Sequence, residues 1–250
     1  MFSIPVAEAL FLRRDYQDTI YEAIKQSELR ETTGYKYSDL PYYLLKTFLE
    51  NYKQTPFSEL IQSAFYKEMG AYELGFNPLK RFQKARIPPT EEDNYFRMQK
   101  IQGTVHDPGA AMLDGVSGHA GLFGHANDVA KMMQLFLWNG YYGGTQYLKS
   151  ETIKAFNTCY FCEDEIRRGV GFDKPQLEDP GPTCGCVSMT SFGHSGFTGT
   201  FTWADPEEDI VYVFLSNRTY PTAENRMLIS SDLRSNVQKL IYEAIIKDTE

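Results

Sequence analysis

Apolar side chains recur along much of the chain at the three- and four-residue spacing of an amphipathic helix. In the first such stretch Tyr16, Ile20 and Ile24 fall on one face, with Asp15 or Asp18 able to cap the start. The same spacing predicts helices over residues 16–26, 42–52, 126–137, 152–157 and 228–246, and one more that Pro56 opens.

The pattern changes near the C-terminus, where short apolar runs are separated by glycine and polar turn residues. Residues 191–217 predict three short strands joined by two tight turns, and the last predicted helix should pack across their sheet. Residues 75–124 are rich in Pro, Gly, Asn and charged side chains without a sustained period. We expect this stretch to be irregular and to run over a surface or around a site.

These patterns predict one interwoven α/β (α+β) fold rather than a repeat protein. We expect a mainly helical subdomain over residues 1–150, a cysteine-containing insertion over 151–190, and an antiparallel sheet with a packed C-terminal helix over 191–250. With 250 residues and 42% apolar content, the chain is large enough to bury a substantial core.

The charge of the chain narrows the classes of partner. A net charge of -8 with scattered Lys and Arg argues against nucleic acid and against an anionic membrane surface. No run of 18 apolar residues occurs, and residues 1–5 lack the pattern of a secretory signal. We therefore expect no membrane span and no signal peptide in this chain.

All four cysteines fall within one short region, at Cys159, Cys162, Cys184 and Cys186. Four thiolates can hold a tetrahedral zinc ion, although the second pair is more tightly spaced than is usual. The alternatives are disulfides that pin a surface insertion, or free thiols without a role. The sequence leaves these three interpretations open.

Candidate chemistry lies in two widely separated motifs. Residues 193–199 read Gly-His-Ser-Gly-Phe-Thr-Gly, and glycines at such positions let a strand approach a ligand closely. Far upstream stands Tyr37-Ser38-Asp39, just before a predicted helix. Taken alone, Asp39 is a candidate N-cap of that helix and Tyr37 a flanking aromatic residue.

Together the two motifs resemble two of the three active-site motifs of the serine β-lactamase and penicillin-binding-protein family. Residues 103–110 (GTVHDPGA) and 115–123 (GVSGHAGLF) extend the likeness. They are similar to a segment of class C-type serine hydrolases, especially those appended to family 3 glycoside hydrolases. The resemblance implies a β-lactamase-like fold and acyl-enzyme hydrolysis of an ester, amide or peptide bond, without a cofactor or a catalytic metal.

The resemblance also implies roles for the first motif. Tyr37 would assist proton transfer, which a phenol does at neutral pH only when nearby positive charge lowers its pKa. Asp39 stands where the family has an amide, so one hydrogen-bond donor is lost and a charge is gained. An ester or peptide substrate is therefore favoured over a β-lactam.

The second motif would form the substrate-facing strand. By resemblance, His194 would hold a substrate carboxylate or tune the tyrosine, and Ser195 would hydrogen-bond the substrate. Gly196 would leave room for the acyl portion, and the backbone N–H of Phe197 would donate to the oxyanion. His106, with Asp107, would act as a general acid or a structural group at the rim of the pocket, or would stabilise its loop. The spacing of His106 and His119 argues against a metal site there.

The third motif, Ser-x-x-Lys, is the family's nucleophile, and no serine in this chain has a lysine three residues later. The resemblance therefore implies the C-terminal portion of a truncated serine hydrolase, inactive alone, whose intact form would act on a cell-wall-like substrate in the periplasm or cell envelope. Its expected partner is the missing N-terminal segment, or another copy, at an exposed sheet edge. The alternative is a non-catalytic binding or assembly module that uses the same groove.

Overall fold

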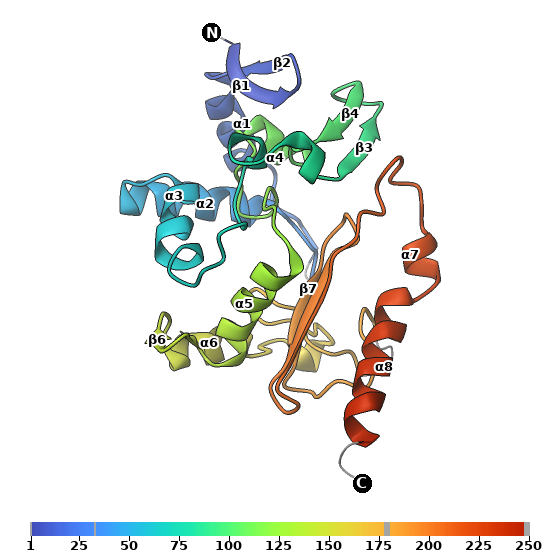
Figure 1. Ribbon diagram of the computed structural model, residues 1–250. Helices are drawn as coiled ribbons and strands as arrows, with labels where there is room; N and C mark the ends of the chain where they lie inside the picture. The colour runs from blue at the N-terminus through green and yellow to red at the C-terminus, as the bar shows by residue number, and fades with distance from the viewer. Residues whose placement is uncertain (1, 33, 178–180, 248–250) are drawn as a thin grey trace. The chain divides into compact units, whose positions relative to one another are not determined.

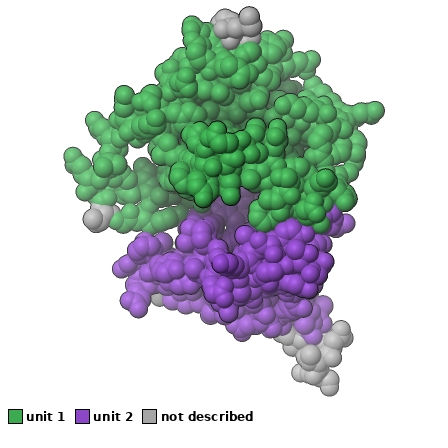
Figure 2. All heavy atoms as spheres, turned by 90° about the vertical axis from the view of Figure 1, so that its left-hand side faces the viewer, with its two compact units in different colours: residues 1–68, 72–124, 220–222 green, residues 69–71, 125–219, 223–250 purple. Residues whose placement is uncertain are grey.

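The computed structural model describes residues 2–32, 34–177 and 181–247. Contacts between residues divide the chain into two units, which Figure 2 colours separately. Unit 1 consists of residues 1–68, 72–124 and 220–222, and unit 2 of residues 69–71, 125–219 and 223–250. Each unit is therefore assembled from segments that are distant in the sequence. The three-part division expected from the sequence stays a prediction.

Unit 1 contains two antiparallel hairpins and several short helices (Figure 1). A small core of Val6, Val105, Ala110 and Ala111 joins the first hairpin to the last helix. Its elements in chain order are β1 (Phe2–Ala7), β2 (Leu10–Arg13), α1 (Tyr16–Lys25), α2 (Leu40–Lys53), α3 (Phe57–Ile61), the π turn η1 (Gln62–Tyr66), the 3-10 turns η2 (Pro78–Lys80) and η3 (Lys84–Arg86), β3 (Pro89–Asp93), β4 (Gln99–Gln102) and α4 (Pro108–Met112).

The hairpin of β3 and β4 lies in the stretch that the sequence predicts to be irregular, and there the prediction is wrong. Few apolar side chains mark these strands. Instead the guanidinium of Arg97, which is fully buried, donates to Asp93 at 2.6 Å and to the carbonyl oxygens of Val105 and His106 at 2.7 Å. A buried, hydrogen-bonded cation thus organises the hairpin, and the spacing of apolar residues in the sequence carries no signal of it.

Unit 2 is built around a three-stranded antiparallel sheet of order β7-β8-β9, which confirms the three predicted strands. Among the described residues of the whole chain, no helix is long and apolar enough to cross a membrane. The elements of unit 2 are α5 (Ala126–Leu137), β5 (Tyr141–Tyr142), β6 (Thr145–Gln146), α6 (Ser150–Asn157), the 3-10 turn η4 (Cys162–Asp164), β7 (Phe192–Ser195), β8 (Phe201–Asp205), β9 (Ile210–Phe214), α7 (Met227–Ser230) and α8 (Leu233–Lys247).

Helices cover both faces of this sheet, because successive side chains of a strand point to opposite faces (Figure 1). One face packs on α5 through Met133, Leu137, Phe192 and Ala204. The other packs on α8 through Phe201, Trp203 and Tyr212, against which Val237 and Ile241 lie. The helix over residues 126–137 and the packed C-terminal helix are therefore both confirmed.

The C-terminal helix differs from its prediction in one respect, because residues 228–246 form two helices rather than one. Ser231 and Asp232 separate α7 from α8, and Asp232 has a φ of +49°. The carbonyl oxygen of Asp232 then accepts the amide N–H of Asn236 at 2.8 Å as α8 begins. Ser and Asp compete for backbone hydrogen bonds, so they favour a helix boundary over an interior.

The four cysteines of the insertion form two short-range disulfides, Cys159–Cys162 and Cys184–Cys186. Because all four sulfur atoms are in disulfides, none is a thiolate that could bind a zinc ion. Of the three interpretations left open by the sequence, the structure has the disulfides. Each bridge closes a local loop instead of joining distant elements, so each constrains only its own turn.

A buried carboxylate fixes α8 to the sheet. Asp205 ends β8 and is fully buried, where it accepts the amide N–H groups of Ser188 at 2.8 Å and Glu207 at 3.1 Å. The hydroxyl of Tyr242, on α8, donates to the same carboxylate at 2.7 Å. Burial raises the pKa of Tyr242, and the adjacent Asp205 raises it further, so the phenol remains a donor.

Replacing Tyr242 by Phe should lower the free energy of unfolding by about 1–3 kcal/mol, because Asp205 stays buried with one hydrogen bond fewer. Urea titration followed by circular dichroism measures this change. Tyr160→Phe, at an exposed position of the same unit, is the control and should change stability by less than about 0.5 kcal/mol. Equal stability of the two variants would contradict the anchoring role of Asp205.

Candidate active site

The Tyr-Ser-Asp motif lies in an extended loop that leads directly into α2. Tyr37 is 54% exposed, and the Ser38 hydroxyl accepts the amide N–H of Leu40 at 3.3 Å. Asp39 occupies the N-cap position of α2, yet its carboxylate makes no capping hydrogen bond. α2 thus begins at Leu40, ahead of the predicted start at residue 42 and directly after the candidate N-cap Asp39, whose carboxylate does not cap the helix.

The helix that follows this motif is held in place through Tyr43. The Tyr43 ring is buried and stacks on the His119 ring with 4.4 Å between the ring centroids. A Cβ atom on Gly109 would lie 1.9 Å from the Tyr43 hydroxyl, so only glycine fits there. Burial raises the pKa of Tyr43, and the Asp107 and Asp39 carboxylates raise it further. Tyr43 is therefore a packing residue.

His119 connects a serine and an aspartate in a hydrogen-bonded chain. Its Nε2 lies 2.9 Å from Asp107 Oδ1, and its Nδ1 lies 2.9 Å from the Ser117 hydroxyl. A carboxylate only accepts, so Nε2 carries the proton and Nδ1 accepts from Ser117. Both Ser117 and the His119 side chain are more than nine-tenths buried. This hydrogen-bonded chain therefore orders the glycine-rich loop of residues 115–123 and does not expose Ser117 as a nucleophile.

The sequence gives a partial signal for this network. His119 is visible there as a candidate metal ligand, but not as the centre of a Ser-His-Asp chain or as the partner of Tyr43. Asp107 also accepts the amide N–H of Ala110 at 2.6 Å and so caps α4. Burial alone raises the pKa of Asp107, but the hydrogen bonds from His119 and Ala110 outweigh it and leave the pKa below its ordinary value.

His106 is drawn into the cluster around Arg97. Its Nε2 lies 3.1 Å from Glu91 Oε2, and its carbonyl oxygen accepts from Arg97. The side chain is 15% exposed. A contact between His106 and substrate stays a prediction.

His194 lies on β7, opposite Thr202 of β8. Its Nε2 is 2.8 Å from a guanidinium nitrogen of Arg168, and its Nδ1 is 2.7 Å from the carbonyl oxygen of Ser195. Arginine only donates, so in this geometry Nε2 accepts and Nδ1–H donates. Arg168 in turn pairs with Asp173 at 3.0 Å, and these contacts hold the imidazole in one orientation.

The residues after His194 form a tight turn. The amide N–H of Gly196 donates to the Thr200 carbonyl oxygen at 2.8 Å, and a Cβ on Gly196 would lie 2.3 Å from the Thr200 hydroxyl. A side chain at position 196 would therefore displace the Thr200 hydroxyl. The Phe197 ring is 62% exposed and carries the Arg218 guanidinium 4.7 Å from its centroid.

The candidate residues fall into two groups, one in each unit. Unit 1 carries Tyr37, Asp39 and His106, whereas unit 2 carries the turn that His194 opens, with Ser195, Gly196 and Phe197. Within unit 2 the geometry brings those four residues together with Arg168. The meeting of Tyr37 and His194 in one cleft stays a prediction, as do the catalytic and substrate-binding roles of all seven residues.

A threonine has the spacing that the serines lack. No serine has a lysine at the required spacing, but Thr33 does, with Lys36 three residues later. Thr33 itself lies outside the described residues. Residues 35–38 form no helix, so Lys36 is not part of the helical turn that a Ser-x-x-Lys motif requires.

Comparison with known proteins gives the family. The Beta-lactamase family model matches residues 5–233, which is most of the chain. An Escherichia coli K12 protein with the provisional name D-alanyl-D-alanine carboxypeptidase is 34% identical over 235 residues, which cover 88% of this chain and 53% of that protein. A Salmonella agona protein with the same name is 32% identical over 224 residues, 84% of this chain and 51% of its own length.

Solved structures share the fold at low sequence identity. Simvastatin synthase from Aspergillus terreus has a TM-score of 0.61 at 15% identity and covers 94% of this chain and 61% of its own. A penicillin-binding protein from Bacillus halodurans has a TM-score of 0.58 at 15% identity and covers 92% of this chain and 65% of its own. The fold is thus that of the β-lactamase-like and penicillin-binding-protein-like serine hydrolases.

The chain belongs to the Beta-lactamase family. It spans about half the length of the curated relatives it matches.

Replacing His119 by Phe should preserve the stack on Tyr43 while removing the hydrogen bond to Asp107. We expect the free energy of unfolding to fall by about 1–3 kcal/mol at pH 7. Because the folded-state pKa of Asp107 is below its unfolded value, this contribution is present above pH 4 or so and is lost as the pH falls further. The difference between the two proteins should therefore shrink on acidification.

Urea titrations of both proteins at several pH values measure this difference. Tyr72→Phe, at an exposed position of unit 1, is the control and should leave the pH profile unchanged. A destabilisation of the His119 variant that is the same at pH 3 and pH 7 would show that the Asp107 bond is not its cause.

Proposed function

We propose that this chain supplies two walls of an acyl-transfer site that hydrolyses an ester, amide or peptide bond through an acyl-enzyme. The observation that carries the proposal is the pair of motifs within one family match: Tyr37-Ser38-Asp39 before α2, and His194-Ser195-Gly196 at the end of β7. In this proposal Tyr37 moves the proton, Asp39 orients, and the β7 turn faces the substrate.

The surroundings of Tyr37 and Asp39 support these roles. Tyr37 is more than half exposed, so a substrate can reach its phenol. The Asp39 carboxylate is free of any capping bond and can therefore orient a substrate or a neighbouring catalytic group. A phenol near its ordinary pKa of about 10 is a poor base at neutral pH, so Tyr37 needs a cation beside it. In this proposal the lysine of a Ser-x-x-Lys motif supplies that positive charge.

The environment of His194 favours a substrate that carries a carboxylate. Arg168 places positive charge beside the imidazole, and its guanidinium also pairs with Asp173 at 3.0 Å. The relatives' name suggests a D-alanyl-D-alanine-ended peptide of the cell wall, which ends in such a carboxylate. We propose this class of substrate, and with it a site of action in the cell envelope. In this proposal His106 contacts the substrate at the rim of the pocket. The backbone N–H of Phe197 donates a hydrogen bond to the oxyanion.

The nucleophilic serine is proposed to come from polypeptide other than residues 1–250. Among the described residues β9 is an edge strand of its sheet, and helices cover both of its faces, which accounts for the continuous apolar run Ile-Val-Tyr-Val-Phe. Such an edge is suited to pairing with another strand, from a nucleophile-bearing segment or from another copy. Alone, the 250-residue chain should therefore bind the substrate without turning it over.

The absence of a Ser-x-x-Lys motif also favours a second candidate, a binding or assembly module without catalysis. The hydrolase and the binding module predict different results once a nucleophile is supplied. A chimera that places the preceding portion of the Escherichia coli relative ahead of residues 1–250 provides that test. D-alanine release from a D-alanyl-D-alanine peptide and hydrolysis of a chromogenic ester measure turnover.

We expect no turnover by the chain alone and measurable turnover by the chimera. Tyr37→Phe in the chimera should lower kcat by roughly 10²–10⁴-fold, since it removes the proton-transfer group. Tyr35→Phe is the matched control, because it removes an exposed phenol two residues away and should change kcat little.

Two results would contradict the catalytic proposal. One is turnover by the chain alone that persists in Tyr37→Phe, because the reaction would then use another site. The other is a folded chimera that binds the peptide with micromolar affinity but releases no D-alanine, which supports the binding module instead.

A further inference from the structure

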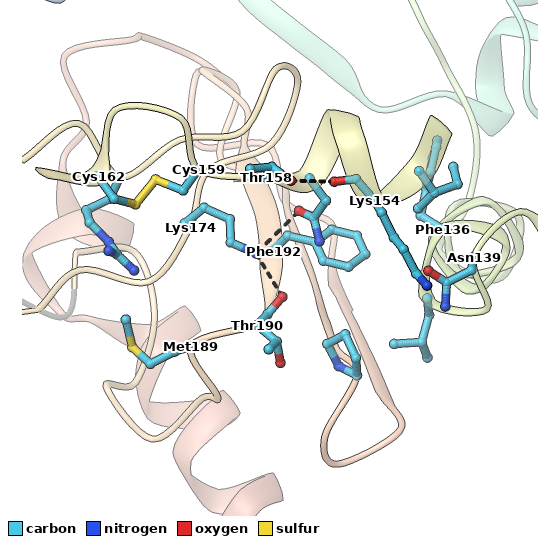
Figure 3. A pocket seen from close by; sticks show the side chains of 15 residues that line it. Phe136, Asn139, Lys154, Thr158, Cys159, Cys162, Lys174, Met189, Thr190 and Phe192 are labelled. Atoms are coloured by element: carbon cyan, nitrogen blue, oxygen red, sulfur yellow. Dashed lines mark hydrogen bonds between the residues drawn. A yellow bond between two sulfur atoms is a disulfide. The ribbon is translucent and has the colours of Figure 1, made fainter. Parts of the chain in front are cut away.

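Unit 2 contains a hollow of about 480 Å³ beside β7, away from the β7 turn residues (Figure 3). Side chains from α5, α6 and β7 line it, together with the segment that contains the Cys159–Cys162 disulfide at its rim. This volume lies within the range of small-molecule sites, which are typically concave and mostly apolar with a few fixed polar groups.

Lys174 projects into the middle of this hollow (Figure 3). The residue is only 6% exposed, and its Nζ donates to the Thr190 carbonyl oxygen at 2.8 Å and lies 3.4 Å from Asn157 Oδ1. Both partners are uncharged. Among the described residues no carboxylate lies within ion-pair distance of this ammonium group, so a buried positive charge lacks a counterion.

The rest of the lining adds positive charge and no negative charge. Arg167 and Lys154 also line the hollow, and no Asp or Glu does. The carboxylates behind the lining are engaged elsewhere: Asp205 by Ser188 and Tyr242, and Glu207 by the Thr190 hydroxyl. The electrostatic field inside therefore favours an anion.

Apolar side chains form the walls around Lys174. Phe136 comes from α5, Ile153 from α6 and Phe192 from β7, while Met189 closes one side and is 47% exposed. The Phe192 ring lies 5.7 Å from the Lys174 ammonium. A ligand that suits both features combines a single negative group with an apolar body.

The protonation of Lys174 is consistent with such a ligand. Burial and, to a smaller extent, the nearby Arg167 lower the pKa of Lys174 to about 8, while Asp205 opposes the change. At neutral pH the amine remains mostly protonated, at a cost in free energy that a bound anion would offset.

We propose that this hollow is a binding site for small carboxylates with an apolar alkyl or aromatic body, whose carboxylate pairs with Lys174. The site is independent of the acyl-transfer chemistry proposed for Tyr37 and His194. It would give unit 2 a second ligand position, next to the strand that carries the His194 motif.

Isothermal titration calorimetry of the 250-residue chain with octanoate tests the proposal, and octanamide provides an uncharged probe of the same shape. We expect octanoate to bind at least tenfold more tightly than octanamide. Lys174→Met keeps the length of the side chain and removes the charge, so it should weaken octanoate binding at least tenfold. Lys239→Met, on the exposed surface of α8, should leave the affinity unchanged.

Equal affinity for octanoate and octanamide, or absence of octanoate binding to the wild-type chain, would overturn the proposal. So would an affinity that Lys174→Met leaves unchanged. The comparison of the two probes uses only the wild-type protein, so it stands even if the Lys174 variant does not fold.

Discussion

The geometry of unit 2 depends on the pairing of β7 with β8. Gly193 lies opposite Trp203, and a Cβ there would be 2.2 Å from the Thr202 carbonyl oxygen, so only glycine permits this close approach. The pairing buries Trp203 against α8 and places His194 at the end of the strand. The Asp173 backbone also pairs with Gly193, which brings Arg168 to the imidazole. A single close strand contact thus sets both the core and the candidate site.

The elements predicted well from the sequence are those held by apolar contacts. The helix over residues 126–137 and the three strands of the sheet are examples, because each buries a regular apolar face. The same reasoning finds α2. Periodicity is a reliable guide where burial of apolar area is the main stabilising term.

Apolar periodicity does not predict the elements that are held by polar contacts. The hairpin of β3 and β4 depends on buried Arg97, and the glycine-rich loop depends on the Ser117–His119–Asp107 chain. Both involve partners that only the folded chain brings together. The break at Asp232 is similar, because one residue with positive φ divides an otherwise continuous apolar pattern. The hairpin of β1 and β2 is not predicted either, because β1 contains Pro5 and its pairing with β2 is irregular in register.

The proposed acyl-transfer reaction requires Tyr37 and His194, which belong to different units, to face the same substrate. Pulsed electron–electron double resonance measures their separation directly, with nitroxide labels on both cysteines of the double variant Tyr37→Cys/His194→Cys. The account predicts a distribution centred within about 20 Å, roughly the length of six extended residues. A distribution centred well beyond that length would contradict the shared site.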